Sequence, residues 1–260
     1  MSLDFTSPQN RAGYPIKQGI NGVQHRRIGI ITGSGPEAGI DLWSKVLFWN
    51  RNALGERFKG DLESPPVVVY SEPLLGLSMN LRRHDNTVWN CLARTVRAIE
   101  PHVDVFTIAC NTLHYYAPRV RSMCISADFL DVAEVVHSYI TERATNSAAL
   151  LGAKPVGSLD EWSPYHVLHS EVSFEQAADL ESVHDLIHRI KHVGGDNPEI
   201  RQSFINILSA LRSETIFLAC TELPLVNATV PGKLLVDIND LLAKELVARS
   251  ISEQEQPKET

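Results

Sequence analysis

Two segments far apart in the chain repeat one pattern, and this repeat constrains the fold more than any other feature. Residues 105–112 read V-F-T-I-A-C-N-T, and residues 215–222 read T-I-F-L-A-C-T-E. Each is a short apolar run, typical of a buried strand, that ends in Ala-Cys and then polar residues. A polar pair after a strand can cap a following helix, and a helix N-terminus favours the thiolate form of cysteine. The repeat predicts one half-domain used twice, with Cys110 and Cys220 facing the same cleft.

The repeat extends downstream of both cysteines. Asp128 follows Cys110 by 18 residues, Asp237 follows Cys220 by 17 residues, and an apolar helical pattern follows each aspartate. Strands that alternate with helices indicate parallel βαβ units, whose ligands bind at the carboxyl ends of the strands. We therefore predict an α/β fold with two pseudo-symmetric lobes, each a parallel sheet flanked by helices, and an active site in the cleft between them.

Periodicity and turn residues also predict how the chain is divided. Residues 1–24 are polar with several Pro and Gly, and residues 251–260 are charged, so we expect a flexible N-terminal arm and a flexible tail. We expect the first lobe to comprise residues 25–125 plus 231–250, and the second lobe residues 126–230. The pattern predicts further strands at 27–32, 66–71, 125–127, 148–152 and 172–174, and helices at 85–99, 129–143, 176–193 and 198–212.

Charge and composition exclude several classes of function. The 260 residues carry a net charge of −7 and have a pI of about 5.8, which argues against nucleic acid or an anionic membrane as a partner. No apolar run approaches the roughly 18 residues of a membrane span, and the N-terminus lacks the apolar core of a signal peptide. Four cysteines in an acidic chain of this size indicate reduced thiols, so we expect a cytoplasmic protein.

A glycine-rich turn follows the first predicted strand. In the sequence G-S-G-P, Gly33 and Gly35 permit a tight turn, and Pro36 suits the first position of a helix. Such a unit offers backbone N–H groups to an anion. It lacks the Lys-Ser/Thr ending of a phosphate-binding loop and the spacing of a dinucleotide fingerprint. We favour a loop that, with Ser34, binds a substrate carboxylate; a nucleotide site and a simple strand–helix connection are the alternatives.

Two cysteines on opposite sides of a cleft suit one kind of reaction. Moving the α-proton of an amino acid from one face to the other needs a base and an acid about one substrate width apart, and a thiolate and a thiol can exchange these roles. The alternative is that Cys110 and Cys220 are ordinary buried core residues. Their repeated polar flank and their position at strand ends favour catalysis. Cys91 and Cys124 lack that flank, and we expect them to pack in the core.

Several side chains next to the two cysteines are candidates for contacts with a substrate. Asn111, Thr112 and Thr221 can donate hydrogen bonds to a carboxylate, and Glu222 can accept an ammonium group or orient its neighbour. His114 can orient the substrate or tune the thiol. Helix capping, or a surface position for His114, is the alternative, and capping is compatible with binding.

One histidine pattern has the spacing of metal ligands. His184, His188 and His192 lie four residues apart and can share one face of a helix. No cysteine near them completes a site, and the chain contains no C-x-x-C pair. We therefore expect no bound metal and interpret the segment as an exposed helix.

Three motifs match a known family. The chain contains I-G-I-I-T-G-S-G-P-E-A at residues 28–38, A-C-N-T-L-H around Cys110 and A-C-T-E-L-P around Cys220. Over residues 27–248 it resembles the cofactor-independent aspartate/glutamate racemase superfamily, nearest the aspartate racemase branch. The resemblance implies two α/β domains that clamp a small amino-acid or carboxylate substrate between the cysteines. It also implies a reaction without pyridoxal phosphate or metal, in proteins that often form homodimers.

The resemblance further implies roles for individual residues. Cys110 and Cys220 are the implied acid/base pair, acting on opposite faces of the α-carbon. Lys191, near the end of its predicted helix, is an implied substrate contact. The implied set for the α-carboxylate is Gly33, Ser34, Gly35, Asn111, Thr112 and Thr221.

The chain departs from the family pattern after its second strand. The family has a P-D-R-like segment whose arginine binds a side-chain carboxylate, whereas residues 71–79 read S-E-P-L-L-G-L-S-M and no arginine follows until Arg82. Arg83, Lys154 and Lys191 are the other cations that can replace it. The function that the resemblance implies is a cofactor-independent amino-acid racemase. A superfamily decarboxylase or cis–trans isomerase of a small dicarboxylate, and a non-catalytic ligand-binding homologue, are the alternatives.

Overall fold

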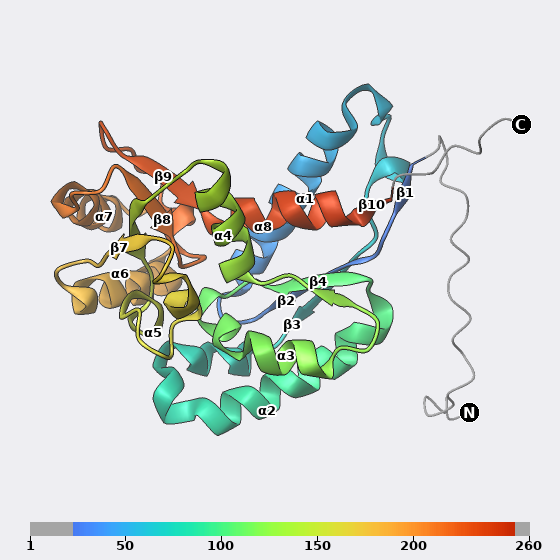
Figure 1. Cartoon of the computed structure of the whole chain (residues 1–260), viewed down its shortest axis with the longest axis horizontal. Helices are drawn as coiled ribbons and strands as arrows, with labels where there is room; N and C mark the ends of the chain where they lie inside the picture. Colours follow the sequence, from blue (N-terminus) through green and yellow to red (C-terminus); the bar gives the residue numbers. More distant parts are fainter. Residues whose placement is uncertain (1–22, 253–260) are drawn as a thin grey trace, which may run out of the picture.

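Two four-stranded parallel sheets form the frame of the protein in a computed structural model that describes residues 23–252 (Figure 1). The first sheet has the order β3-β2-β4-β5, and the second has the corresponding order β7-β6-β8-β9. This arrangement confirms the predicted α/β fold with two similar lobes. The strands are β2 (Ile28–Thr32), β3 (Val67–Ser71), β4 (Val105–Ile108), β5 (Asp128–Phe129), β6 (Ser147–Leu151), β7 (Ser173–Glu175), β8 (Thr215–Leu218) and β9 (Leu234–Asp237).

The central strands of the first sheet are buried along their whole length. Every residue of β2 and β4 is buried, as expected for parallel strands covered by helices on both faces. Ile28 of β2 lies opposite Val67 of β3 on one side and Val105 of β4 on the other. In the second sheet, Ala149 of β6 lies opposite Ile216 of β8. The strands β4 and β8, which precede the two cysteines, therefore occupy equivalent positions in the two sheets.

Helices connect the strands, and most of the longer ones begin at a side-chain cap. Asp131, Asp179, Asn197 and Asp237 accept N–H groups of the first turn of α4, α6, α7 and α8. The α-helices are α1 (Pro36–Leu54), α2 (Leu81–Ile99), α3 (Ala117–Met123), α4 (Val132–Glu142), α5 (Lys154–Gly157), α6 (Leu180–Val193), α7 (Pro198–Ala210) and α8 (Ile238–Ser250). The 3-10 segments are η2 (Gly55–Arg57), η3 (Asp61–Glu63), η4 (Pro73–Asn80), η5 (Glu100–His102), η6 (Asn111–Tyr116), η7 (Pro164–Leu168) and η8 (Leu223–Leu225).

The two aspartates that repeat in the sequence have different roles in the structure. Asp237 caps α8 and forms an ion pair with Lys45 of α1 at 2.6 Å. Asp128 lies in β5 and pairs with Arg26 at 2.5 Å, while Asp131 caps the following helix. The spacing therefore identified the strand that follows each cysteine, but an equivalent cap in only one of the two copies.

The short strands after the cysteines stay in the sheet of the preceding strand. β5 pairs with β4, although residues 126–230 were expected in the second lobe, because Asp128 N donates to Asp104 O at 2.9 Å and Phe129 packs against Phe106. β9 pairs with β8, although residues 231–250 were expected in the first lobe. The expected strand at 125–127 is instead a loop whose N–H groups donate to the carboxylate of Glu100. We propose to assign the lobes by sheet, with β2 to β5 in the first and β6 to β9 in the second.

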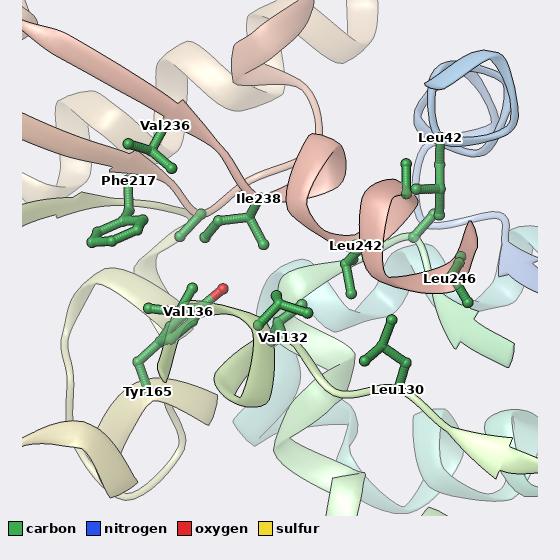
Figure 2. Packing of buried hydrophobic residues seen from close by; sticks show 14 of the residues in the cluster. Leu42, Leu130, Val132, Val136, Tyr165, Phe217, Val236, Ile238, Leu242 and Leu246 are labelled. Carbon is green, nitrogen blue, oxygen red and sulfur yellow. The ribbon is translucent and has the colours of Figure 1, made fainter. Parts of the chain in front are cut away.

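The helices that follow these strands lie at the junction of the lobes. In Figure 1, α8 (red) crosses beside α1 (blue) and also contacts α4. Figure 2 shows the cluster that this packing buries, in which Leu42 of α1 and Leu130 belong to the same core as Phe217 of β8 and Val236 of β9. Each fully buried side chain of this kind contributes about 1.5–3 kcal/mol. A shared core therefore fixes the orientation of the two sheets, and two further clusters fill the individual lobes.

The two ends of the described chain are paired. β1 (Gln24–His25) and β10 (Ile251–Ser252) form a two-stranded antiparallel ribbon, next to which Arg26 N donates to Ser250 O at 2.7 Å. The predicted arm and tail therefore begin later than expected, because these backbone groups are hydrogen-bonded. The remainder of each, residues 1–22 and 253–260, lies outside the described residues. Within 23–252, no helix is both long and apolar enough to cross a membrane.

Candidate active site

The two repeated cysteines lie at equivalent strand ends and both are buried. Cys110 follows β4 in an extended conformation and directly precedes η6. Cys220 follows β8, but Glu222 rather than the cysteine is the cap residue of η8. The prediction of a cysteine at a helix N-terminus therefore holds in position for Cys110, with a 3-10 segment in place of an α-helix, and was wrong for Cys220.

Hydroxyl groups surround the sulfur of Cys110. Its Sγ lies 3.7 Å from Ser78 Oγ, and Ser78 Oγ lies 2.9 Å from Ser34 Oγ. Ser78 is fully buried on η4, the segment after the second strand that sequence analysis treated as an apolar loop. Leu75 of the same segment points into the core of the first lobe, which leaves Ser78 on the side facing the cysteine. Sequence analysis missed Ser78 because a single serine among leucines gives no functional signal.

A carboxylate is the partner of Cys220. Its Sγ donates a hydrogen bond to Glu222 Oε2 at 2.9 Å, and Thr221 Oγ1 donates to the same oxygen at 3.2 Å. Burial raises the pKa of Cys220 well above its ordinary value, and the negative charge of Glu222 raises it further. Cys220 is therefore held as a thiol in the free protein.

Lys191, in the last turn of α6, connects this carboxylate to the first lobe. Its Nζ forms an ion pair with Glu222 and donates to the main-chain oxygen of Ser34 at 2.9 Å. Burial by itself lowers the pKa of Lys191, but the charge of Glu222 outweighs this, so the pKa is raised. Both Cys110 and Cys220 are near enough to contribute to that shift. Lys191 therefore lies between the two sulfur atoms as a charged ammonium.

The glycine turn packs directly against this ion pair. Gly35 has φ +112°, and a Cβ there would lie 2.1 Å from Glu222 Oε1 and 2.9 Å from Lys191 Nζ. Gly33 has φ +118°, and a Cβ there would lie 2.2 Å from the main-chain oxygen of Glu72. Both positions thus require glycine for conformation and for space. The structure brings the predicted loop of Gly33, Ser34 and Gly35 to the same place as the second cysteine.

Asn111 is oriented by a residue that sequence analysis missed. Tyr165, from η7 in the second lobe, is fully buried and donates its hydroxyl hydrogen to Asn111 Oδ1. Burial raises the pKa of Tyr165 well above its ordinary value, and the charges of Asp131, Cys220 and Cys110 act in the same direction. The tyrosine is therefore a hydrogen-bond donor close to both cysteines. An isolated tyrosine in an irregular segment offers no pattern that could have identified it.

His114 is directed toward the backbone of its own lobe. Its Nε2 lies 2.9 Å from Ile108 O, and its Nδ1 accepts a hydrogen bond from Val132 N at 3.3 Å. The imidazole is buried and stacks on Phe129. Both ring nitrogens are engaged in a neutral ring, so this geometry supports a structural role and not the predicted contact with a substrate. Thr112, the other predicted contact beside it, is buried in the same 3-10 segment.

The remaining candidates lie apart from these groups or are already paired. Arg82 pairs with Asp160, Lys154 pairs with Glu181, and Arg83 is exposed, which leaves Lys191 as the one of the four candidate cations beside the cysteines. Cys91 is buried in the core of the first lobe, and Cys124 Sγ donates to Val120 O at 3.2 Å. His184, His188 and His192 lie on α6, and His184 Nδ1 accepts from Lys154 N at 3.1 Å. Across residues 23–252 no three His, Cys, Asp or Glu side chains cluster as metal ligands do.

Solved structures of racemases share this fold. Picrophilus torridus aspartate racemase matches with a TM-score of 0.70 and 20% identity, covering 86% of this chain and 94% of that one. An aspartate racemase homologue from Pyrococcus horikoshii matches with a TM-score of 0.66, 20% identity and coverage of 86% and 98%. Francisella tularensis glutamate racemase in complex with D-glutamate matches with a TM-score of 0.59, 16% identity and coverage of 86% and 81%.

The sequence itself matches a family model. A comparison with curated protein sequences finds no significant match. Residues 50–246, most of the chain, match the model described as Asp/Glu/hydantoin racemase, a range that includes both repeated cysteines. The chain therefore belongs to the Asp/Glu/hydantoin racemase family, and it is an isomerase of the amino-acid racemase class.

Proposed function

We propose that Cys110 and Cys220 are the acid/base pair of this racemase. The observation that best supports the proposal is that Lys191 and Tyr165 each lie within electrostatic range of both sulfur atoms, so the two cysteines flank one small space. The Cys110 thiolate takes the α-proton of the substrate from one face, and the Cys220 thiol gives its proton to the opposite face. The product has the inverted configuration, Cys110 is then the thiol, and the reverse reaction restores the starting state.

The ion pair between Lys191 and Glu222 is proposed to open when the substrate binds. An α-amino acid carries a carboxylate that pairs with Lys191 and an ammonium group that pairs with Glu222, so the zwitterion replaces each partner of the pair with another. Glu222 then no longer accepts from Cys220, whose S–H is free to face the α-carbon. The ammonium of Lys191 also stabilises the negative charge that spreads into the carboxylate as the α-proton leaves.

The α-carboxylate is proposed to be completed by groups on the first lobe. The loop of Gly33, Ser34 and Gly35 reaches Lys191 and supplies backbone N–H groups, and the amide nitrogen of Asn111 is oriented by Tyr165. Thr112 and Thr221 remain proposed contacts. His114 is better explained as a support of η6, because its ring nitrogens are already bonded.

The substrate is proposed to carry a neutral side chain. Lys191 is the candidate cation beside the cysteines, and its pairing with the α-carboxylate leaves no second one for a side-chain carboxylate. Burying an unpaired carboxylate costs about 2–7 kcal/mol or more. We therefore expect homoserine or methionine to be better substrates than aspartate or glutamate. A comparison of kcat/KM for these four amino acids tests this, and a strong preference for aspartate would contradict it.

The function is tested by incubating the protein with single enantiomers in D₂O. Racemisation through two bases predicts that the product enantiomer carries deuterium at the α-carbon, which chiral chromatography with mass spectrometry resolves. Conversion of a small dicarboxylate without any amino-acid racemisation would instead indicate the decarboxylase or cis–trans isomerase. Binding of an amino acid by calorimetry without exchange of its α-proton would indicate a non-catalytic homologue.

We also propose that the protein forms a homodimer in the cytoplasm. Ile40, Trp43 and Phe48 on α1 are 66%, 43% and 55% exposed, and these large apolar side chains suit contact with the same face of a second copy. Light scattering of the wild type and of Trp43→Glu tests the dimer, which the substitution should dissociate. All four cysteines are free thiols, as a reducing compartment favours, and cell fractionation tests this location.

A further inference from the structure

Ser78 and Cys110 form the part of the site that has no equivalent around the second cysteine. Ser78 is fully buried, and its two hydrogen-bond partners are Cys110 Sγ at 3.7 Å and Ser34 Oγ at 2.9 Å. A serine hydroxyl has one hydrogen to donate and can also accept. The middle hydroxyl of this chain therefore donates to one neighbour and accepts from the other.

The chain of hydroxyls can run in either direction. When Ser34 donates to Ser78, Ser78 donates to the sulfur, and this arrangement suits a Cys110 thiolate. When the sulfur carries a proton, its S–H donates to Ser78 Oγ, and Ser78 donates to Ser34. Both arrangements keep the buried hydroxyls hydrogen-bonded, which is the state that buried polar groups require. Ser78 can thus support Cys110 before and after it accepts a proton.

The partner of Cys220 has no such freedom. The Glu222 carboxylate is acceptor-only, and it already accepts from Thr221 and Lys191 as well as from the Cys220 sulfur. A carboxylate 2.9 Å from a sulfur favours the thiol and repels the thiolate. The two cysteines therefore have unequal environments in the free protein.

We infer that Ser78 is a positioning residue for Cys110, and that with Ser34 behind it the free enzyme rests with Cys110 as the thiolate and Cys220 as the thiol. This inference rests on the proposed two-cysteine function. It assigns to η4 a role that differs from binding a substrate side chain. It also places the starting proton, because the only sulfur with a hydroxyl donor is the one that begins as the base.

The inference is tested by alkylation of the free enzyme with iodoacetamide, which reacts with thiolates. Trypsin cleavage after Lys and Arg places each of the four cysteines in its own peptide, so mass spectrometry follows them separately. In the wild type we expect Cys110 to react faster than Cys220. In Ser78→Ala we expect alkylation of Cys110 at pH 8 to slow about tenfold, the effect of losing one hydrogen bond to a charged group, while Cys220 is unchanged.

Two further variants separate this role from a general effect on the cleft. Ser34→Ala leaves the side chain next to the sulfur in place but removes the hydroxyl behind it, and we expect a smaller slowing at Cys110 alone. Thr107→Val removes another buried hydroxyl of the first lobe, one that donates to Leu130 O at 2.8 Å, and we expect no change at Cys110. Unchanged Cys110 reactivity in both serine variants would overturn the inference, as would equal changes at Cys110 and Cys220.

Turnover supplies the second readout. Since the equilibrium constant of racemisation is one, Ser78→Ala should lower kcat/KM by the same factor in both directions, mainly through kcat, and Ser78→Thr should recover part of it. Turnover of Ser78→Ala at the wild-type rate would overturn the positioning role and leave the racemase function intact. Failure of the wild type to racemise any amino acid would instead remove the proposed function, while alkylation would still decide whether Ser78 supports Cys110.

Discussion

Lys191 of the second lobe donates a hydrogen bond to the main-chain oxygen of Ser34 in the first lobe, at 2.9 Å. The same ammonium pairs with Glu222, whose other oxygen accepts from the Cys220 sulfur, and the side chain of Ser34 leads through Ser78 to Cys110. One connected set of polar groups therefore links the two cysteines across the junction of the lobes. The predictions below alter its members one at a time.

Replacing either cysteine with serine should abolish racemisation. Cys110→Ser and Cys220→Ser each remove one of the two proposed proton carriers, and general acid–base catalysis is worth about 10²–10⁴-fold. The surviving cysteine should still exchange the α-proton of one enantiomer with D₂O, which mass spectrometry detects. Cys91→Ser, in the core of the first lobe, is the control. Full racemisation by either site variant would be incompatible with a two-base reaction.

Breaking the ion pair from the lysine side should destabilise the fold. Lys191→Met leaves the Glu222 carboxylate buried without its partner, which costs about 3–5 kcal/mol. The Lys191 side chain is 22% exposed, whereas the side chain of Lys154, which pairs with Glu181, is 57% exposed. Lys154→Met is therefore the matched control, and its expected cost is at most about 1 kcal/mol. Urea unfolding measures both, and the double variant Lys191→Met/Glu222→Gln should recover part of the loss. Equal costs for the two single lysine variants would show that the Lys191 pair is not an important buried contact.

Neutralising Glu222 should make Cys220 more reactive. Burial and the charge of Glu222 both raise the pKa of Cys220, so Glu222→Gln removes one of the two causes and lowers that pKa. The onset of Cys220 alkylation should therefore move to lower pH, which peptide mass spectrometry over pH 6–10 can follow. Glu181→Gln, on the exposed pair of Lys154, should leave the profile of Cys220 where it is. An unchanged profile in Glu222→Gln would show that the carboxylate does not control this thiol.

Removing the hydroxyl of Tyr165 should reduce activity with little change of shape. Tyr165→Phe leaves the buried Asn111 Oδ1 without its donor, at a cost of about 1–3 kcal/mol, and frees the amide to turn. We expect kcat/KM to fall roughly five- to tenfold on that ground. Tyr116→Phe is the control, because its hydroxyl donates to Asp85 Oδ1 at 2.6 Å in the first lobe. It should lose stability alone, and an equal loss of activity in both variants would argue that Tyr165 acts only through folding.

The acid limb of stability should depend on Glu175. Burial tends to raise its pKa, but hydrogen bonds from the Arg212 and Ser213 backbone and from the Ser213 hydroxyl outweigh this and lower it from 4.5 to about 2. A folded-state pKa below the unfolded one contributes stability above about pH 4.5, and this is lost as the pH falls toward 2. Glu175→Gln should therefore lower Tm at pH 7 and flatten its decline between pH 5 and 2. Glu199→Gln, at a carboxylate 85% exposed, should leave both unchanged. A decline as steep in Glu175→Gln as in the wild type would contradict this assignment.

The sequence was sufficient for the architecture and for the central part of the site. The apolar runs of β4 and β8 are buried on both faces, so their hydrophobicity alone predicted parallel strands, and the repeated Ala-Cys endings predicted equivalent positions for Cys110 and Cys220. The glycine turn was predictable for a similar reason, since Gly33 and Gly35 are required by local φ values. These features depend on interactions between neighbours in the chain, which a sequence displays directly.

Tertiary structure alone decided which side chains surround the sulfur atoms. Ser78, Tyr165 and Lys191 lie 32, 55 and 29 residues from the cysteines whose site they complete, and nothing in their own segments marks them. His114 shows the converse, because its position beside Cys110 in the sequence predicted a contact that its bonds to Ile108 and Val132 direct elsewhere. Hydrogen bonding across lobes depends on how two sheets pack around a shared core. That packing is a property of the whole chain, so a local pattern could predict the two reacting groups but not the partners that set their protonation.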